Sequence, residues 1–179
     1  MSASPKEQAA PADLSALLRH FADLRDGVHG DNAYSRESKE QLFVAAVSLL
    51  GPFARQALEE MNAQLLLSAG EITGGQARRT RDGSLIAVWA LTWAQQREAG
   101  LAPVSLQAYY GADFHHPHLR GATVGEWPLN VFTPEQAARE LPTLRAIASA
   151  DLHNLVFQRN YGIVPATVER DDGIGVQKV

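Results

Sequence analysis

The chain has 179 residues, of which 45% are hydrophobic and 20% charged, and its formal net charge at pH 7 is −4. These values are typical of one soluble globular domain, large enough to bury a core without disulfides. The absence of cysteine excludes disulfides, a thiol nucleophile, and zinc or iron–sulfur clusters held by cysteine, and the acidic balance gives no broad basic surface for nucleic acid.

The N-terminal residues 1–12 are small, polar and rich in Pro and Ala, without the apolar segment of a secretory signal. We expect them to form a flexible tail. The longest apolar run, residues 42–50, is too short to cross a bilayer, so no membrane span is expected. Together with the lack of cysteine, these features predict a cytoplasmic protein.

Residues 13–26 are predicted to form a helix, because large apolar residues recur there at helical spacing. These residues are Leu14, Leu17, Leu18, Phe21 and Leu24. Asp13 is a suitable N-cap, and Gly27 a suitable C-terminal stop. His20 lies off the apolar stripe and is expected at the surface.

A second helix is predicted after Ser38, which forms a capping-box pattern with Gln41. Its first part is apolar nearly all round and should be buried. Gly51-Pro52 is expected to interrupt it, with a new helix starting at Pro52 and ending by Gly70.

The periodicity then changes to that of strands. Asp82-Gly83 is a hairpin-turn signal, and the run 84–93 is apolar on both faces, as in a central strand covered on both sides. Residues 104–110 alternate like a half-buried strand, and 127–132 are typical of an edge strand because of Pro128. The predicted core of this region consists of Leu85, Val88, Trp89, Leu91 and Leu106.

The chain returns to helices at Thr133, where Pro134 and Gln136 complete a capping signal. Pro142 should kink or restart the helix, which continues to about Arg159. The sequence therefore predicts an α+β fold: N-terminal helices, a small antiparallel sheet, and C-terminal helices packed on the sheet. One domain is expected over residues 13–162, followed by a tail over 163–179.

The stretch FHHPHLRG, residues 114–121, carries three of the six histidines. The candidate ligand-binding residues are His115, His116, His118 and Arg120. Pro117 favours an extended chain, so the side chains of His116, His118 and Arg120 should share one side.

Three uses of this stretch remain open. His116 and His118 have the spacing to hold a divalent metal, with Asp113 or Glu126 as the carboxylate. The same histidines with Arg120 can instead hold an anion. The third interpretation is structural: a rigid turn whose imidazoles satisfy backbone carbonyls.

The order of strands, FHHPHLRG and helix over about residues 84–148 is similar to the region before the active site in ubiquitin-conjugating-type folds, which has a His-Pro step. The catalytic cysteine that this resemblance would imply has no counterpart in the chain, and the N-terminal helices are longer. The chain is therefore assigned to no family.

No dinucleotide, P-loop or nucleophile-elbow motif occurs in the chain. The function expected from the sequence is that of a non-catalytic accessory or small subunit of a bacterial multiprotein enzyme, with a protein partner or as a homo-oligomer. The alternative is a small metal-dependent or anion-binding enzyme with its site at FHHPHLRG. The cofactor would then be a divalent metal.

Overall fold

The computed structural model describes residues 11–30 and 33–171. At its centre is an antiparallel sheet with the strand order β1-β3-β4-β5-β6, and β2 shares one edge of β3 with β1. The strands are β1 (Glu71–Gly74), β2 (Arg78–Arg79), β3 (Leu85–Thr92), β4 (Val104–Tyr110), β5 (His118–Arg120) and β6 (Gly125–Pro128). The helices are α1 (Ala12–Asp26), α2 (Arg36–Leu65), α3 (Ala94–Glu98), α4 (Pro134–Arg139), α5 (Leu141–Gln158), η1 (Tyr161–Ile163) and α6 (Pro165–Asp171). This is the predicted α+β arrangement.

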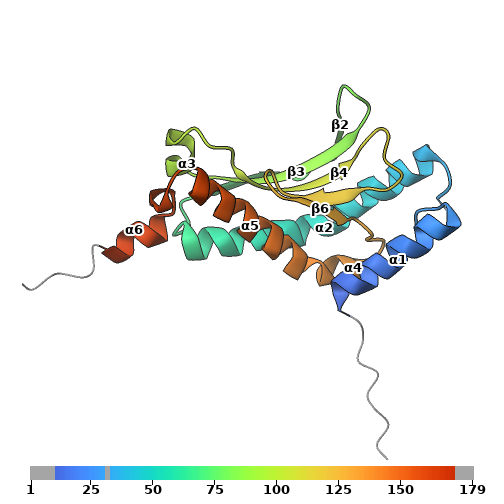
Figure 1. The fold of residues 1–179 in the computed structure, drawn as a ribbon, viewed down its shortest axis with the longest axis horizontal. Helices are drawn as coiled ribbons and strands as arrows, with labels where there is room; N and C mark the ends of the chain where they lie inside the picture. Colours follow the sequence, from blue (N-terminus) through green and yellow to red (C-terminus); the bar gives the residue numbers. More distant parts are fainter. Residues whose placement is uncertain (1–10, 31–32, 172–179) are drawn as a thin grey trace, which may run out of the picture.

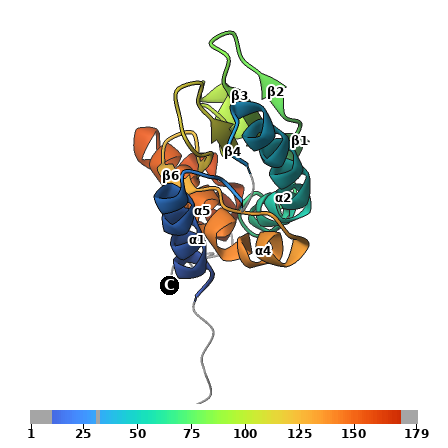
Figure 2. The same ribbon diagram turned by 90° about the vertical axis from the view of Figure 1, so that its right-hand side faces the viewer.

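Helices α2 and α5 pack against each other and cover one face of the sheet (Figures 1 and 2). The core lies between these layers and includes Phe43, Leu58, Trp89, Leu106 and Leu144. Apart from Ser105, the residues of β3 and β4 that face away from the helices are only partly buried, which makes the fold a two-layer structure.

The prediction that β3 is covered on both sides was wrong. Buried and half-buried residues alternate along this strand, and the side chains of Ile86 and Val88 lie on the less covered face. Apolar β-branched residues favour the strand backbone on either face, so they do not by themselves indicate two covering layers. The other four residues predicted as core here are buried: Leu85, Trp89, Leu91 and Leu106.

Helix α2 continues through Gly51 and Pro52, where two helices were predicted. A proline inside a helix removes one backbone hydrogen bond and usually bends the helix. Here the buried residues Leu50 and Ala54 lie on either side of the interruption. We infer that their packing against the sheet and α5 outweighs the lost bond.

The ends of α2 also differ from the prediction. The N-cap is Ser35, whose hydroxyl accepts a hydrogen bond from the Ser38 backbone N–H at 3.1 Å. The helix ends at Leu65, five residues before Gly70. Among the described residues, α2 is the one helix that is long and apolar enough to cross a membrane by length and composition; core helices meet the same criterion, and α2 supplies much of this core.

The predicted turns and the α4 cap are confirmed. Strands β2 and β3 form a hairpin around Asp82-Gly83, and Gly83 has a φ of +86°, which glycine adopts without strain. At α4, the Thr133 hydroxyl accepts from the Gln136 backbone N–H at 3.2 Å, and Pro134 is the first helical residue.

Helix α1 packs with its polar side inward. Ala16 and Asp23 are buried. An apolar stripe on a helix ordinarily faces the core, but here it faces outward: Leu14, Leu18, Phe21 and Leu24 remain between 49% and 65% exposed. His20, which was expected at the surface, is half-buried. The inward side of α1 therefore supplies polar groups to the interior of the protein.

The C-terminal tail was predicted to begin at residue 163, which is too early. Ile163 and Val164 belong to the core, and α6 extends the ordered fold to Asp171. The buried Trp93 indole N–H donates a 2.6 Å hydrogen bond to the Ile163 carbonyl, which fixes this segment. Residues 1–10 of the predicted N-terminal tail (1–12) and residues 172–179 of the predicted C-terminal tail (163–179) lie outside the described residues.

Candidate metal centre

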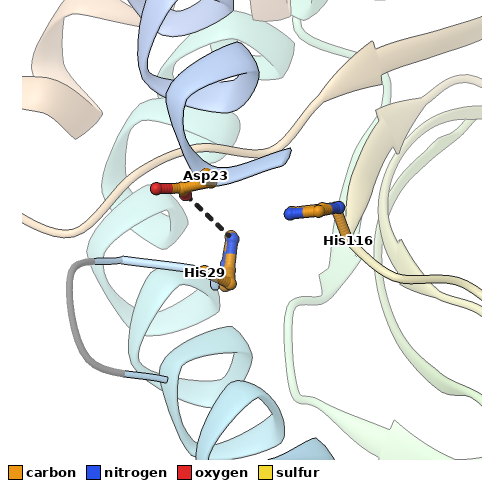
Figure 3. Close-up of side chains that lie close together, drawn as sticks. All are labelled: Asp23, His29 and His116. Carbon is orange, nitrogen blue, oxygen red and sulfur yellow. Dashed lines mark ion pairs between the residues drawn. The ribbon is translucent and has the colours of Figure 1, made fainter. Parts of the chain in front are cut away.

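Three buried side chains from separate parts of the chain converge beneath α1: Asp23, His29 and His116 (Figure 3). One potential ligand atom from each lies within 4.8 Å of the other two. Asp23 comes from α1, His29 from the loop after it, and His116 from the connection between β4 and β5. Of the three, only His116 was a candidate from the sequence.

The position of Asp23 is fixed by its hydrogen bonds. Its Oδ2 accepts a bond from the Gly30 backbone N–H at 3.0 Å and another from the Asn130 side-chain amide at 3.2 Å. Arg19, one helical turn earlier, donates to both the side chain and the carbonyl of Asn130 at 2.9 Å. These bonds hold the Oδ2 atom of Asp23 in place, and Oδ1 has no described partner in this network.

His29 is positioned by the sharp end of α1. Gly27 adopts the left-handed conformation that ends the helix, and the Val28 N–H donates back to the Asp23 carbonyl at 3.0 Å. The His29 N–H then donates to the Ala33 carbonyl at 3.0 Å, so the loop turns back on itself. This geometry directs the imidazole inward, where it is 2% exposed.

The Nδ1 atom of His29 is buried and has no hydrogen-bond partner among the described residues. It lies 3.6 Å from Asp23 Oδ2, which is too long for a good hydrogen bond. A buried polar atom without a partner costs roughly 1–3 kcal/mol and calls for an explanation. A metal ion between the nitrogen and the carboxylate would provide one.

His116 already has a partner. Its Nε2 meets the Val28 carbonyl at 3.0 Å, across 88 residues of sequence. This contact matches the structural interpretation of FHHPHLRG, in which an imidazole satisfies a backbone carbonyl. To ligate a metal through the same nitrogen, His116 must carry its proton on Nδ1 instead, a change of tautomer that keeps the ring neutral.

The electrostatic surroundings keep both imidazoles neutral. Burial lowers the pKa of His29 to about 4, assisted by the nearby His116. Burial also lowers the pKa of His116. Neutral imidazole is the form that binds metal, so both rings are ready to do so at neutral pH. The ammonium group of buried Lys39 contributes to both shifts and opposes a bound cation, whereas the Asp23 carboxylate favours one.

The distances fit a small divalent ion after modest adjustment. Tetrahedral coordination at about 2.1 Å places neighbouring ligand atoms about 3.4 Å apart. The separation of His29 Nδ1 and Asp23 Oδ2, 3.6 Å, is already close to this value. The largest separation in the set, at most 4.8 Å, can close by rotation of the His116 ring.

Further histidines surround the cluster. His20 lies edge-on to His116, with ring centroids 4.8 Å apart, and His118 has a buried Nδ1 without a described hydrogen-bond partner. Burial lowers the pKa of both. His20, His116 and His118 line a surface pocket of about 340 Å³. Any ligand reaching a metal from this side would meet these imidazoles together with the carboxylates of Asp113 and Glu126.

Of the residues predicted from FHHPHLRG, His115, His116 and His118 line one pocket, and Arg120 makes its contacts outside it. His116 turns inward, and His118 and Arg120 lie on β5 with Leu119 buried between them. Arg120 stacks over the Tyr109 ring, with its Cζ 4.1 Å from the centroid, and donates to the Gln107 side chain at 3.0 Å.

The remaining candidates lie at the surface. His115, Asp113 and Glu126 are exposed and line the same pocket as His118. The Arg120 guanidinium approaches Glu126 at 3.8 Å, which offsets part of its charge. The three-residue set found in the structure therefore contains one of the predicted ligands, and its carboxylate comes from α1.

Comparison with protein-family models, with curated proteins and with solved structures returns no match to this chain.

Proposed function

We propose that this protein binds one divalent transition-metal ion, with Asp23, His29 and His116 as ligands. The observation that carries the proposal is the buried Nδ1 of His29, which has no described hydrogen-bond partner and points towards the Asp23 carboxylate. Two neutral imidazoles and one carboxylate form a mixed nitrogen and oxygen set that suits Zn²⁺.

The number of ligands favours a functional site over a purely structural one. Structural zinc sites are usually closed by four protein ligands, whereas catalytic sites have three and leave one position open. The pocket lined by His116, His20 and His118 lies beside this site. We propose that it gives access to the metal, which corresponds to the small metal-dependent enzyme considered from the sequence.

Zinc binding by tag-free protein tests the proposal. After treatment with a chelator and dialysis, isothermal titration with Zn²⁺ should give one site per chain. Asp23→Asn, His29→Gln and His116→Gln should each weaken binding at least tenfold, because each removes one ligand. His115→Gln and His153→Gln remove exposed histidines and serve as matched controls. Equal binding by the three ligand variants and the parent would refute the site.

A second candidate function, the accessory subunit expected from the sequence, has one observation in its favour. The exposed apolar stripe on α1 consists of four large side chains on one helical face. Contiguous apolar patches of this kind mark interaction surfaces. Co-purification of a stoichiometric partner with the chain from its native cells would support this function, and recovery of the chain alone would count against it.

A further inference from the structure

We propose that the outward stripe of α1 (Leu14, Leu18, Phe21 and Leu24) pairs with the same stripe of a second copy of this chain, with the two helices antiparallel. The proposal concerns the face of α1 opposite Asp23 and does not depend on metal binding. The helix directs Ala16 and Asp23 into the protein and leaves these four large apolar side chains exposed, which is the reverse of the usual orientation.

The stripe is continuous along the helix. Leu14, Leu18 and Phe21 follow one another at four and three residues, so they lie on one side of the helix. Leu24 extends the stripe towards the C-terminal end. Each of the four is between 49% and 65% exposed, and together they give an apolar surface over about three turns.

The charges at the two ends of the stripe favour a second, antiparallel copy. Asp13 lies in the first turn of α1, and Arg25 lies in the last turn; both are exposed. Arg25 donates to the neighbouring Asp26 through Nε and one terminal nitrogen, which leaves its other terminal nitrogen free to reach across. In an antiparallel pair Asp13 of each copy lies near Arg25 of the other, whereas a parallel pair would bring like charges together.

The size of the surface sets the strength of the expected association. Four half-exposed apolar residues offer a few hundred Å², less than the roughly 800 Å² per partner of a standard interface. The pair should therefore be weak, with a dissociation constant on the order of tens of micromolar. The antiparallel arrangement also brings each helix N-terminus near the C-terminus of its partner, which the helix dipoles favour.

Sedimentation velocity of the full chain between about 1 and 200 μM tests this proposal, with a monomer–dimer equilibrium as the expected result. Leu18→Glu and Phe21→Glu should each leave a folded monomer at every concentration, because both side chains are exposed. Phe157→Glu, at the even more exposed Phe157 near the end of α5, should leave the dimer unchanged.

A charge exchange tests the orientation. Asp13→Lys and Arg25→Glu should each weaken the dimer, and the double variant should restore it, because the charges then attract again across the pair. A monomeric parent at 200 μM, or a dimer that survives Phe21→Glu, would overturn the proposal. A monomer that binds anionic vesicles through the stripe would also overturn the proposal, and the stripe would then be a membrane-binding surface.

Discussion

His29 Nδ1 lies 3.6 Å from the Oδ2 atom of Asp23, and both groups are buried. The pair joins the C-terminal part of α1 to the loop that follows it. His116 approaches the same point from the sheet and contacts the carbonyl of Val28, the neighbour of His29. A metal bound by all three would connect the helix, the loop and the sheet.

The first prediction concerns the attachment of α1. Arg19 and Asp23 hold α1 to other segments by hydrogen bonds, and the metal would add a bond at Asp23. Zn²⁺ should therefore slow amide hydrogen exchange in α1 more than in α5. Asp23→Asn should abolish this protection. If Zn²⁺ protects α1 equally in that variant, the ion binds elsewhere.

The second prediction tests the orientation of α1. Leu18→Ala should change the free energy of unfolding of the monomer by less than about 0.5 kcal/mol, because Leu18 is 65% exposed. Ala16→Leu should destabilise it by about 1–3 kcal/mol, because Ala16 is buried and a larger side chain must displace its neighbours. Urea denaturation at low protein concentration measures both. The opposite order of effects would mean that the stripe faces the core.

The sequence predicts those features of the fold that depend on interactions between residues close together in the chain. The α4 cap at Thr133 and the Asp82-Gly83 turn involve neighbours in sequence, and both are confirmed. The orientation of α1 depends instead on what packs beside it, and periodicity alone cannot distinguish a stripe that faces the core from one that faces outward.

The same limit applies to the site. Asp23 and His29 are separated from His116 by 93 and 87 positions, and no local spacing pattern connects them. The available signal was a histidine between two glycines, in the segment Gly27–Gly30, where Gly27 was expected to end the helix. Pro117 was expected to hold His116 on the same side as His118; both line one pocket, and His116 in addition reaches inward to the Val28 carbonyl.

A third prediction concerns Asp151, a fully buried carboxylate on α5. It accepts hydrogen bonds from the Ser105 N–H at 2.9 Å, the Thr123 N–H at 2.7 Å and the Thr123 hydroxyl at 2.6 Å. Asp151→Ala should lower the free energy of unfolding by roughly 2–5 kcal/mol, because the buried Ser105 N–H and the partly buried Thr123 N–H lose their acceptor. Chemical denaturation measures the loss, with Asp113→Ala at an exposed position as the control. A loss below about 0.5 kcal/mol would contradict this role.

A fourth prediction is a pH dependence at Glu140. Burial raises the pKa of this carboxyl above its ordinary value of 4.5, against smaller opposing effects of Thr143 and Arg19. The folded state therefore binds the proton more tightly than the unfolded state, so its stabilising effect is present below pH 4.5 and is lost as the pH rises through the folded-state pKa. Glu140→Gln, which cannot ionise, should gain stability relative to the parent between pH 4 and pH 7. Unfolding curves at both pH values measure this gain, and an unchanged difference would refute the shift.

The most direct test of the metal centre is X-ray absorption at the zinc edge on protein loaded with one equivalent of Zn²⁺. The proposed ligand set predicts nitrogen and oxygen neighbours at about 2.0–2.1 Å, with the outer-shell scattering of two imidazole rings. His29→Gln should reduce the imidazole contribution to one ring, and His115→Gln should leave the spectrum unchanged. A spectrum without imidazole scattering, or one that His29→Gln does not alter, would contradict a zinc site formed by Asp23, His29 and His116.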